Sequence, residues 1–93
     1  MPRTAERLLI EGRVQGVGFR WWTVGQARAL GLAGWVRNRR DGSVEVLAIG
    51  ETQALEALAR ACAQGPAGAV VRSMRRARAQ DDGSPSFDER ATA

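Results

Sequence analysis

The sequence contains no histidine, lysine or tyrosine, and only one cysteine. A single cysteine cannot form a disulfide within the chain, and without histidine there is no plausible ligand set for zinc or haem. No apolar run approaches the roughly 20 residues of a membrane-spanning helix, and residues 1–13 lack the apolar segment and cleavage site of a signal peptide. We therefore expect a cytoplasmic, metal-free protein.

All 14 basic residues are arginine, and they outnumber the 10 acidic residues to give a net charge of +4. Such an excess favours anionic partners, from nucleic acid down to a single phosphate group. Uniform arginine usage with abundant alanine is also what a coding bias produces, so the charge does not by itself select a function. The length of 93 residues suits one domain without disulfides or metal.

The first half of the chain predicts a strand, a helix and a hairpin. Between residues 7 and 14, the apolar residues Leu8, Ile10 and Val14 share one parity, which is typical of a strand with one buried face. Residues 21–30 show helical spacing, and Gly31 supplies a C-terminal stop. The β-prone runs 34–38 and 43–49 are joined through an Asp-Gly pair, which indicates a hairpin.

The second half predicts a helix and two strands. Thr52 can cap the helix, whose apolar face includes Cys62, so this thiol is expected in the core rather than as a nucleophile. A fourth strand is predicted over residues 70–80, and a short final strand near 87–91. The order β-α-β-β-α-β indicates the α+β class, the ferredoxin-like split βαβ fold with two helices on one face of an antiparallel sheet. Residues 1–93 are treated as a single domain.

The segment GRVQGVGFR, residues 12–20, joins the first strand to the first helix. Gly16 and Gly18 can adopt backbone angles that other residues avoid, and they let main-chain N–H groups converge on one small anion. The helix that follows adds its dipole, and the Arg20 guanidinium can make two hydrogen bonds to phosphate oxygens. No Gly-Lys-Ser/Thr follows, so the segment is not a P-loop. A tight turn without any ligand is the alternative interpretation.

Three blocks, GRVQGVGFR, ALGLAGWVRNRRDGSVEV and QGPAGAVV, together resemble the acylphosphatase family. They occur in order and at the family's spacing, roughly from Leu9 to Met74. The resemblance implies a small α/β enzyme that hydrolyses the carboxyl–phosphate bond of acyl phosphates to a carboxylate and inorganic phosphate. It also implies that the reaction needs neither a metal nor an organic cofactor.

The resemblance also implies roles for individual residues. By position, Arg20 is expected to bind the phosphate and Asn38 to position the attacking water, so both are the expected catalytic residues. The other phosphate-binding residues, which inorganic phosphate or sulfate would also contact, are Gln15, Gly16, Val17, Gly18 and Phe19. Phosphoryl transfer depends mainly on positioning and charge stabilisation, so an amide and a guanidinium can suffice. Asparagine beside a hairpin turn often bonds local backbone, which is the structural alternative for Asn38.

Several neighbouring residues have less defined roles. Many relatives carry a hydroxyl residue directly after the catalytic asparagine, whereas this chain has Arg39, a change expected to alter the rate rather than abolish it. Arg37, Arg39 and Arg40 are expected to form a solvated basic rim. For Trp21 and Trp22, both a core position and an exposed rim are compatible with the sequence.

Two other functions are compatible with the predicted fold. One is a nucleic-acid-binding module, although the strand predicted at 43–49 lacks aromatic residues for base stacking. The other is an accessory domain, because the same motifs occur at the N-terminus of much longer carbamoyltransferases that mature hydrogenases. We expect a stand-alone monomeric enzyme that acts on a small-molecule acyl phosphate and has no nucleic-acid or membrane partner.

Overall fold

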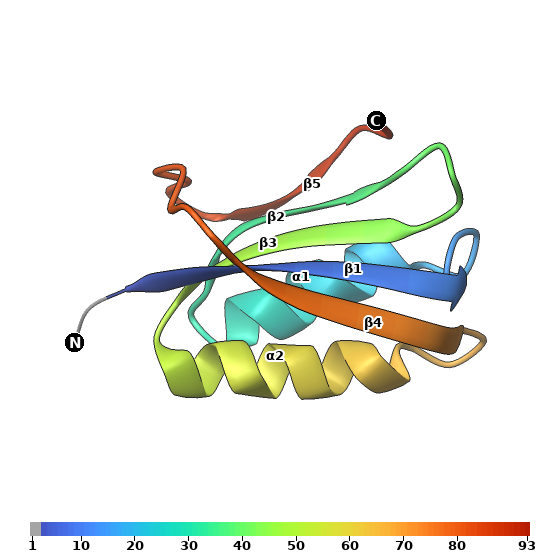
Figure 1. The fold of residues 1–93 in the computed structure, drawn as a ribbon, viewed down its shortest axis with the longest axis horizontal. Helices are drawn as coiled ribbons and strands as arrows, with labels where there is room; N and C mark the ends of the chain where they lie inside the picture. The colour runs from blue at the N-terminus through green and yellow to red at the C-terminus, as the bar shows by residue number, and fades with distance from the viewer. Residues whose placement is uncertain (1–2) are drawn as a thin grey trace.

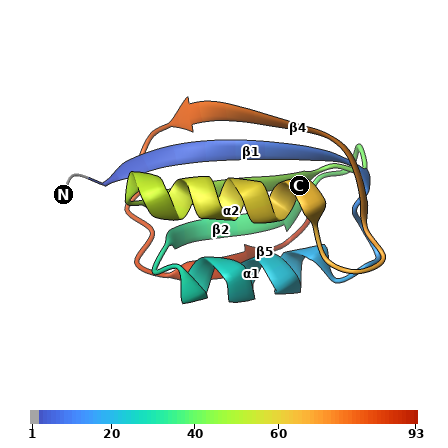
Figure 2. The ribbon, with the colours of Figure 1, turned by 90° about the horizontal axis from the view of Figure 1, so that it is seen from below.

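The computed structural model describes residues 3–93, which form two helices and five strands. In chain order these elements are β1 (Thr4–Arg13), α1 (Phe19–Ala29), β2 (Ala33–Asn38), β3 (Val44–Gly50), α2 (Thr52–Gln64), β4 (Val70–Ala79) and β5 (Phe87–Arg90). The strands form one sheet in the order β4-β1-β3-β2-β5 (Figure 1). Both helices cover the same face of this sheet (Figure 2). The predicted ferredoxin-like α+β fold is confirmed.

The sheet is mixed rather than wholly antiparallel. Strands β1 to β4 pair antiparallel as predicted, but β5 pairs parallel with β2, with Gly34 opposite Phe87 and Arg37 opposite Arg90. The direction of β5 follows from where β4 ends. Because β4 runs in the same direction as β3, it finishes at the end of the sheet where β2 begins, so a strand that starts there runs alongside β2.

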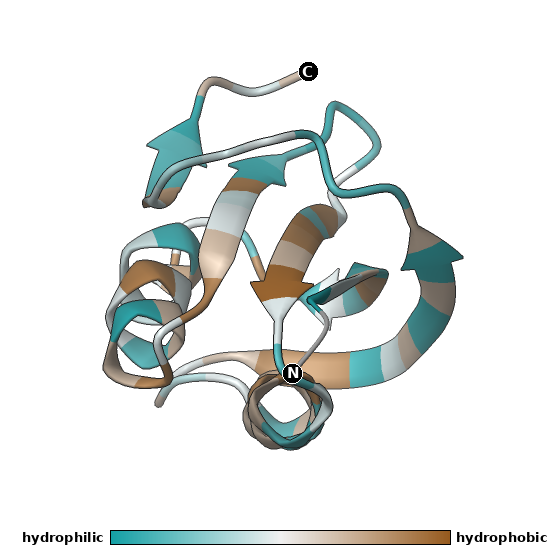
Figure 3. Ribbon diagram, turned by 90° about the vertical axis from the view of Figure 1, so that its left-hand side faces the viewer, coloured by the Kyte–Doolittle hydropathy of each residue, from teal (hydrophilic) through white to brown (hydrophobic). Residues whose placement is uncertain are grey.

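The main core lies between the helices and the sheet. Leu8 and Val36 from the strands and Leu58 from α2 are buried in it, and in Figure 3 strong hydrophobic colour accordingly lies on β3 at the centre of the sheet. Cys62 is buried in the same cluster, and this burial raises the pKa of its thiol to about 12. The prediction that Cys62 is a core residue is therefore confirmed. Neither helix of the described chain has the length and apolar character to cross a membrane.

Both helices begin differently from the sequence prediction. Helix α1 begins at Phe19 rather than at residue 21, because Gly18 takes a left-handed conformation and serves as its N-cap. Thr52 is the first residue of α2 and not its cap; the cap position belongs to Glu51, which makes no side-chain capping hydrogen bond. Arg20 therefore lies in the first turn of α1, where its position directly after the glycine turn already placed it.

The open face of the sheet carries a buried carboxylate. Glu45 on β3 is only 3% exposed and accepts hydrogen bonds from three guanidinium groups, those of Arg7, Arg37 at 2.8 Å and Arg39 at 3.0 Å. Burial raises the pKa of the Glu45 carboxyl, but the three hydrogen bonds outweigh it and hold that pKa below its usual value. Of the three arginines expected to form a solvated rim, Arg37 and Arg39 are therefore half-buried and bound to Glu45, and Arg40 is exposed.

Gly12 is required where β1 meets β4. The pairing register shifts between Glu11 and Gly12, which marks a bulge near the end of β1. Gly12 has a φ of 136°, and a Cβ atom built there would lie 2.2 Å from the carbonyl oxygen of Val70. A side chain at this position would therefore push β4 away from β1 just before the turn that follows.

Candidate active site

Three segments that are distant in the sequence meet at one end of the sheet (Figure 1). They are the glycine turn, residues 14–18, the end of β2 at Asn38, and the stretch that follows β5. Strands β1 and β2 both pair antiparallel with β3, so they finish at the same end of the sheet. The Ala93 N–H donates to the carbonyl oxygen of Asn38 at 3.0 Å, and the Arg40 N–H donates to that of Ala93 at 3.0 Å. The chain after β5 thus continues alongside the end of β2.

A pocket of about 140 Å³ opens where these segments meet. Its lining residues are Val14, Gln15, Gly16, Gly18, Phe19, Arg20, Trp21, Asn38 and Glu89. The structure thus brings together Arg20 and Asn38, the two expected catalytic residues, and most of the expected phosphate-binding turn. Val17 is the exception, because it is not among the lining residues and its side chain packs against the core.

The glycine turn presents main-chain N–H groups without protein partners. Gly16 and Gly18 have φ values of 74° and 76°, and a Cβ atom at either position would meet nothing within 4 Å. Glycine is therefore needed here for its backbone angle and not for space. The first helical hydrogen bond of α1 runs from the Trp22 N–H to the carbonyl oxygen of Gly18 at 3.0 Å. None of the N–H groups of residues 16–20 donates a hydrogen bond to the described chain.

Arg20 is held in place by the last strand. Its Nη1 donates to the carbonyl oxygen of Arg90 at 3.1 Å, which connects the first turn of α1 to the end of β5. A guanidinium has five N–H donors in a planar fork, so this single contact orients the group and leaves other donors for a ligand.

Asn38 is the last residue of β2, and its side chain lies on the helix-covered face of the sheet. Because side chains alternate along a strand, the Asn38 side chain lies on the same face of the sheet as that of Val36, which is buried in the main core. Within residues 3–93, the Asn38 side chain makes no hydrogen bond, so the bonding to local backbone that such asparagines often show is not observed. The amide is therefore available to a ligand in the pocket.

Gln15 has a role that the sequence did not indicate. Its Nε2 donates to two carbonyl oxygens of the β2–β3 turn, that of Arg39 at 2.7 Å and that of Ser43 at 2.9 Å. The Gln15 side chain therefore fastens the glycine turn to the hairpin that carries Asn38, and only its backbone is left to face a ligand. No local pattern in the sequence points to such a long-range contact.

Glu89 is the second feature that sequence reasoning missed. It lies opposite Val36 in the β2–β5 pairing and is the acidic residue among those that line the described pocket. Its position depends on the parallel register of β5, which the sequence does not reveal. A carboxylate at this place opposes the binding of an anion, so it moderates the attraction exerted by Arg20.

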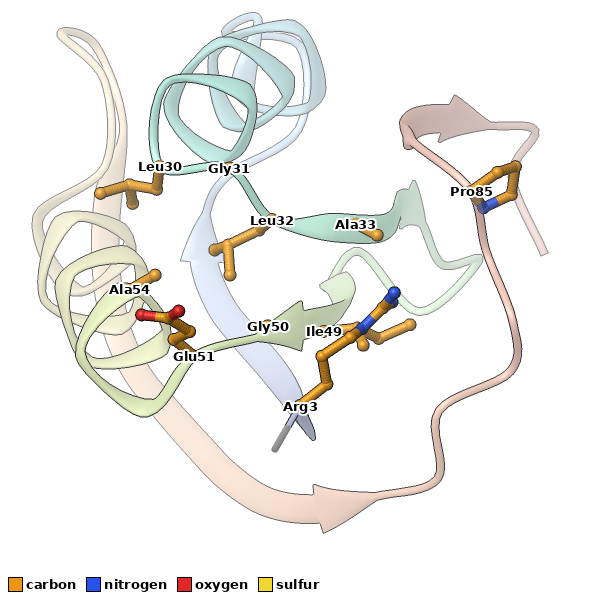
Figure 4. A pocket seen from close by; sticks show the side chains of 10 residues that line it. All are labelled: Arg3, Leu30, Gly31, Leu32, Ala33, Ile49, Gly50, Glu51, Ala54 and Pro85. Atoms are coloured by element: carbon orange, nitrogen blue, oxygen red, sulfur yellow. The ribbon is translucent and has the colours of Figure 1, made fainter. Parts of the chain in front are cut away.

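A larger pocket, of about 530 Å³, lies at the opposite end of the sheet (Figure 4). It is lined largely by small and apolar side chains around Leu32 and Ile49. Its basic residue, Arg3, is already paired with Asp81 at 3.5 Å. Size therefore does not identify the site; the small pocket is the one in which a cation, an amide and unpartnered N–H groups converge.

Comparisons with known proteins identify the family. The Acylphosphatase family pattern matches residues 6–88. An acylphosphatase of Acidiphilium cryptum (strain JF-5) is 51% identical over 88 residues, which cover 95% of this chain and 97% of that protein. An acylphosphatase from Coxiella burnetii has a similar structure, with a TM-score of 0.91 and 32% identity over 95% of this chain and 93% of that one. Full-length HypF in its phosphate- and nucleotide-bound form matches with a TM-score of 0.91 and 25% identity over 98% of this chain but only 12% of HypF. The chain described here belongs to the acylphosphatase family and is an enzyme of that family.

Proposed function

We propose that the enzyme hydrolyses acyl phosphates in the small pocket at the end of β1 and β2. The observation that carries the proposal is the convergence of Arg20, Asn38 and the unpartnered N–H groups of residues 16–20 on one pocket. The N–H groups and the guanidinium bind the phosphoryl oxygens, and Asn38 holds the attacking water on the opposite side of the phosphorus.

The electrostatics of the pocket suit a phosphoryl group. The N-terminus of α1 carries no acidic residue in its first turn and no side-chain cap, so its dipole and N–H groups are directed at whatever occupies the turn. Arg20 adds a full positive charge within that same turn. Glu89 is the opposing charge, and it lowers the affinity for the dianionic product as well as for the substrate.

In the proposed reaction, the oxygen of the bound water attacks phosphorus while the bond from phosphorus to the acyl oxygen breaks. The carboxylate departs with the bonding electron pair and needs no general acid, because it is a stable anion. The water's proton passes to an oxygen of the phosphoryl group itself, so the products are a carboxylate and inorganic phosphate. Positioning and charge stabilisation then account for catalysis, and no strong base is required.

The test is hydrolysis of benzoyl phosphate in the presence of a chelator, followed as loss of substrate. We expect activity to persist with the chelator, and Arg20→Gln and Asn38→Ala each to lower kcat by about 10²-fold or more, the effect of removing one preorganised transition-state donor. Arg60→Gln is the matched control, since Arg60 is exposed on α2 and does not line the pocket. Folded Arg20 and Asn38 variants with wild-type turnover would overturn the assignment.

A further inference from the structure

Trp21 is 78% exposed, although it lies next to Arg20 in the first turn of α1. Apart from Val70, no other large hydrophobic side chain is exposed among residues 3–93. Trp21 also lines two hollows at once, the pocket that contains Arg20 and a neighbouring groove along the outer side of α1. It is therefore the residue that connects them.

The groove has a volume of about 320 Å³ and is lined by Trp21, Trp22, Val24, Gly25, Gln26 and Arg28. Trp22 forms its fixed part, because its ring packs edge-on against Phe19 with centroids 5.4 Å apart. Gly25 is part of the groove lining, and a Cβ atom built there would meet nothing within 4 Å. A glycine inside a helix costs about 1 kcal/mol relative to alanine, and no packing contact explains Gly25.

The charged residue of the groove is already engaged. Nε of Arg28 donates to the carbonyl oxygen of Phe87 at 3.1 Å, and its Nη2 lies 3.4 Å from a carboxylate oxygen of Asp88. The guanidinium is thus directed at β5 and paired with an opposite charge. The rest of the groove is lined by the indole rings of Trp21 and Trp22, the aliphatic side chain of Val24 and the amide of Gln26. This surface suits an uncharged apolar group and offers no charged partner for a carboxylate.

The pocket beside the groove is too small to enclose a substrate with a large acyl group. At about 140 Å³ it falls well below the roughly 300–1,000 Å³ of pockets that surround drug-sized ligands. Once the N–H groups of the turn and Arg20 hold the phosphoryl group, as in the proposed function, a larger acyl part extends toward the mouth of the pocket. Trp21 lies on that mouth, and the groove continues from it.

We propose that the groove is the acyl subsite and that Trp21 selects substrates with an aromatic or extended apolar acyl group. This inference rests on the proposed function, because it requires the phosphoryl group in the pocket. The indole face of Trp21 stacks on the acyl group, and the side chains of Trp22 and Val24 provide the apolar surface beyond it. Acetyl phosphate, whose acyl group ends at a methyl, is too short to reach along the groove.

The experiment compares benzoyl phosphate with acetyl phosphate on the wild type, Trp21→Ala and Trp21→Phe. We expect Trp21→Ala to raise KM for benzoyl phosphate about tenfold, the effect of losing an aromatic stacking contact and its buried area. Its kcat for benzoyl phosphate and its KM for acetyl phosphate should stay within about twofold of wild type. Trp21→Phe, which retains an aromatic face, should recover most of the benzoyl phosphate KM.

The outcomes separate this inference from the proposed function. Unchanged KM for benzoyl phosphate in Trp21→Ala, or an equal rise for both substrates, would overturn the acyl subsite and leave the hydrolysis itself intact. A wild-type protein that hydrolyses neither substrate would overturn the proposed function and the subsite with it. Because Trp21 is exposed, its substitution removes little core packing, and circular dichroism of each variant checks that the fold is retained.

Discussion

The side-chain nitrogen of Gln15 lies 2.7 Å from the carbonyl oxygen of Arg39, the residue that directly follows Asn38. A second hydrogen bond, 2.9 Å long, connects the same nitrogen to Ser43 at the other end of the β2–β3 turn. The turn that presents the N–H groups and the strand that presents the amide are therefore joined by one side chain. These two hydrogen bonds set the separation between the glycine turn and Asn38, so we expect changes to the Gln15 side chain to alter kcat.

Gln15→Met is expected to reduce both stability and turnover. Methionine has a similar length but no donor, so two hydrogen bonds are lost at about 0.5–1.5 kcal/mol each. The free energy of unfolding in urea should fall by about 1–3 kcal/mol, and kcat by about tenfold, because Asn38 and the glycine turn are no longer held in register. An unchanged kcat in this variant would show that Gln15 does not position the site.

Gly18→Ala tests whether the backbone angle of the turn matters for activity. A left-handed conformation costs a residue with a Cβ atom about 1–2 kcal/mol, and no steric clash adds to this cost at Gly18. Gly31→Ala is the matched control, because Gly31 has a φ of 71° and equally open surroundings at the other end of α1. Both variants should lose similar stability, but only Gly18→Ala should lose activity. Equal activity in the two would contradict the anion-binding role of the turn.

Glu89→Gln should strengthen the binding of inorganic phosphate. Removing a negative charge that lines the pocket lowers the electrostatic cost of a dianion by about 1 kcal/mol, so the inhibition constant of phosphate should fall about fivefold. The difference should shrink at high salt, since this site is open to solvent. Glu51→Gln, at the far end of the sheet, is the control and should leave the constant unchanged. A weaker inhibition by phosphate in Glu89→Gln would refute the opposing role of this carboxylate.

Glu45→Gln should change how the free energy of unfolding depends on pH. The folded-state pKa of the Glu45 carboxyl lies below its ordinary value of 4.5, so its stabilising contribution is present above that value. The contribution is lost as the pH falls through the lower folded-state pKa. The free energy of unfolding of the wild type should therefore fall more steeply below about pH 4.5 than that of Glu45→Gln. At pH 7 the variant should be less stable than the wild type by about 1.5–3 kcal/mol. Parallel pH profiles from urea unfolding would contradict this.

Patterns of neighbouring residues were sufficient to predict most of the fold. Most elements depend on contacts between residues close in the sequence or on burying one face. Examples are the alternation in β1, the Asp-Gly hairpin between β2 and β3, and the apolar face of α2. The turn with Gly16 and Gly18 and the position of Arg20 at the start of α1 are local in the same sense. These features are encoded by backbone preference and hydrophobic periodicity, so they could be predicted without knowing what packs against them.

The tertiary structure decided what depends on partners distant in the chain. The parallel pairing of β5 with β2 brings Glu89 to the pocket and the Arg90 carbonyl to Arg20, although 70 residues separate the last two. The same applies to the Gln15 contacts and to the exposure of Trp21 beside the half-buried Trp22. Such contacts form only when the strands assemble into the sheet. The interacting groups lie too far apart in the sequence for any local pattern to include both of them. The sequence by itself therefore determined the elements and the glycine turn, and the assembled sheet determined the remaining surroundings of the site.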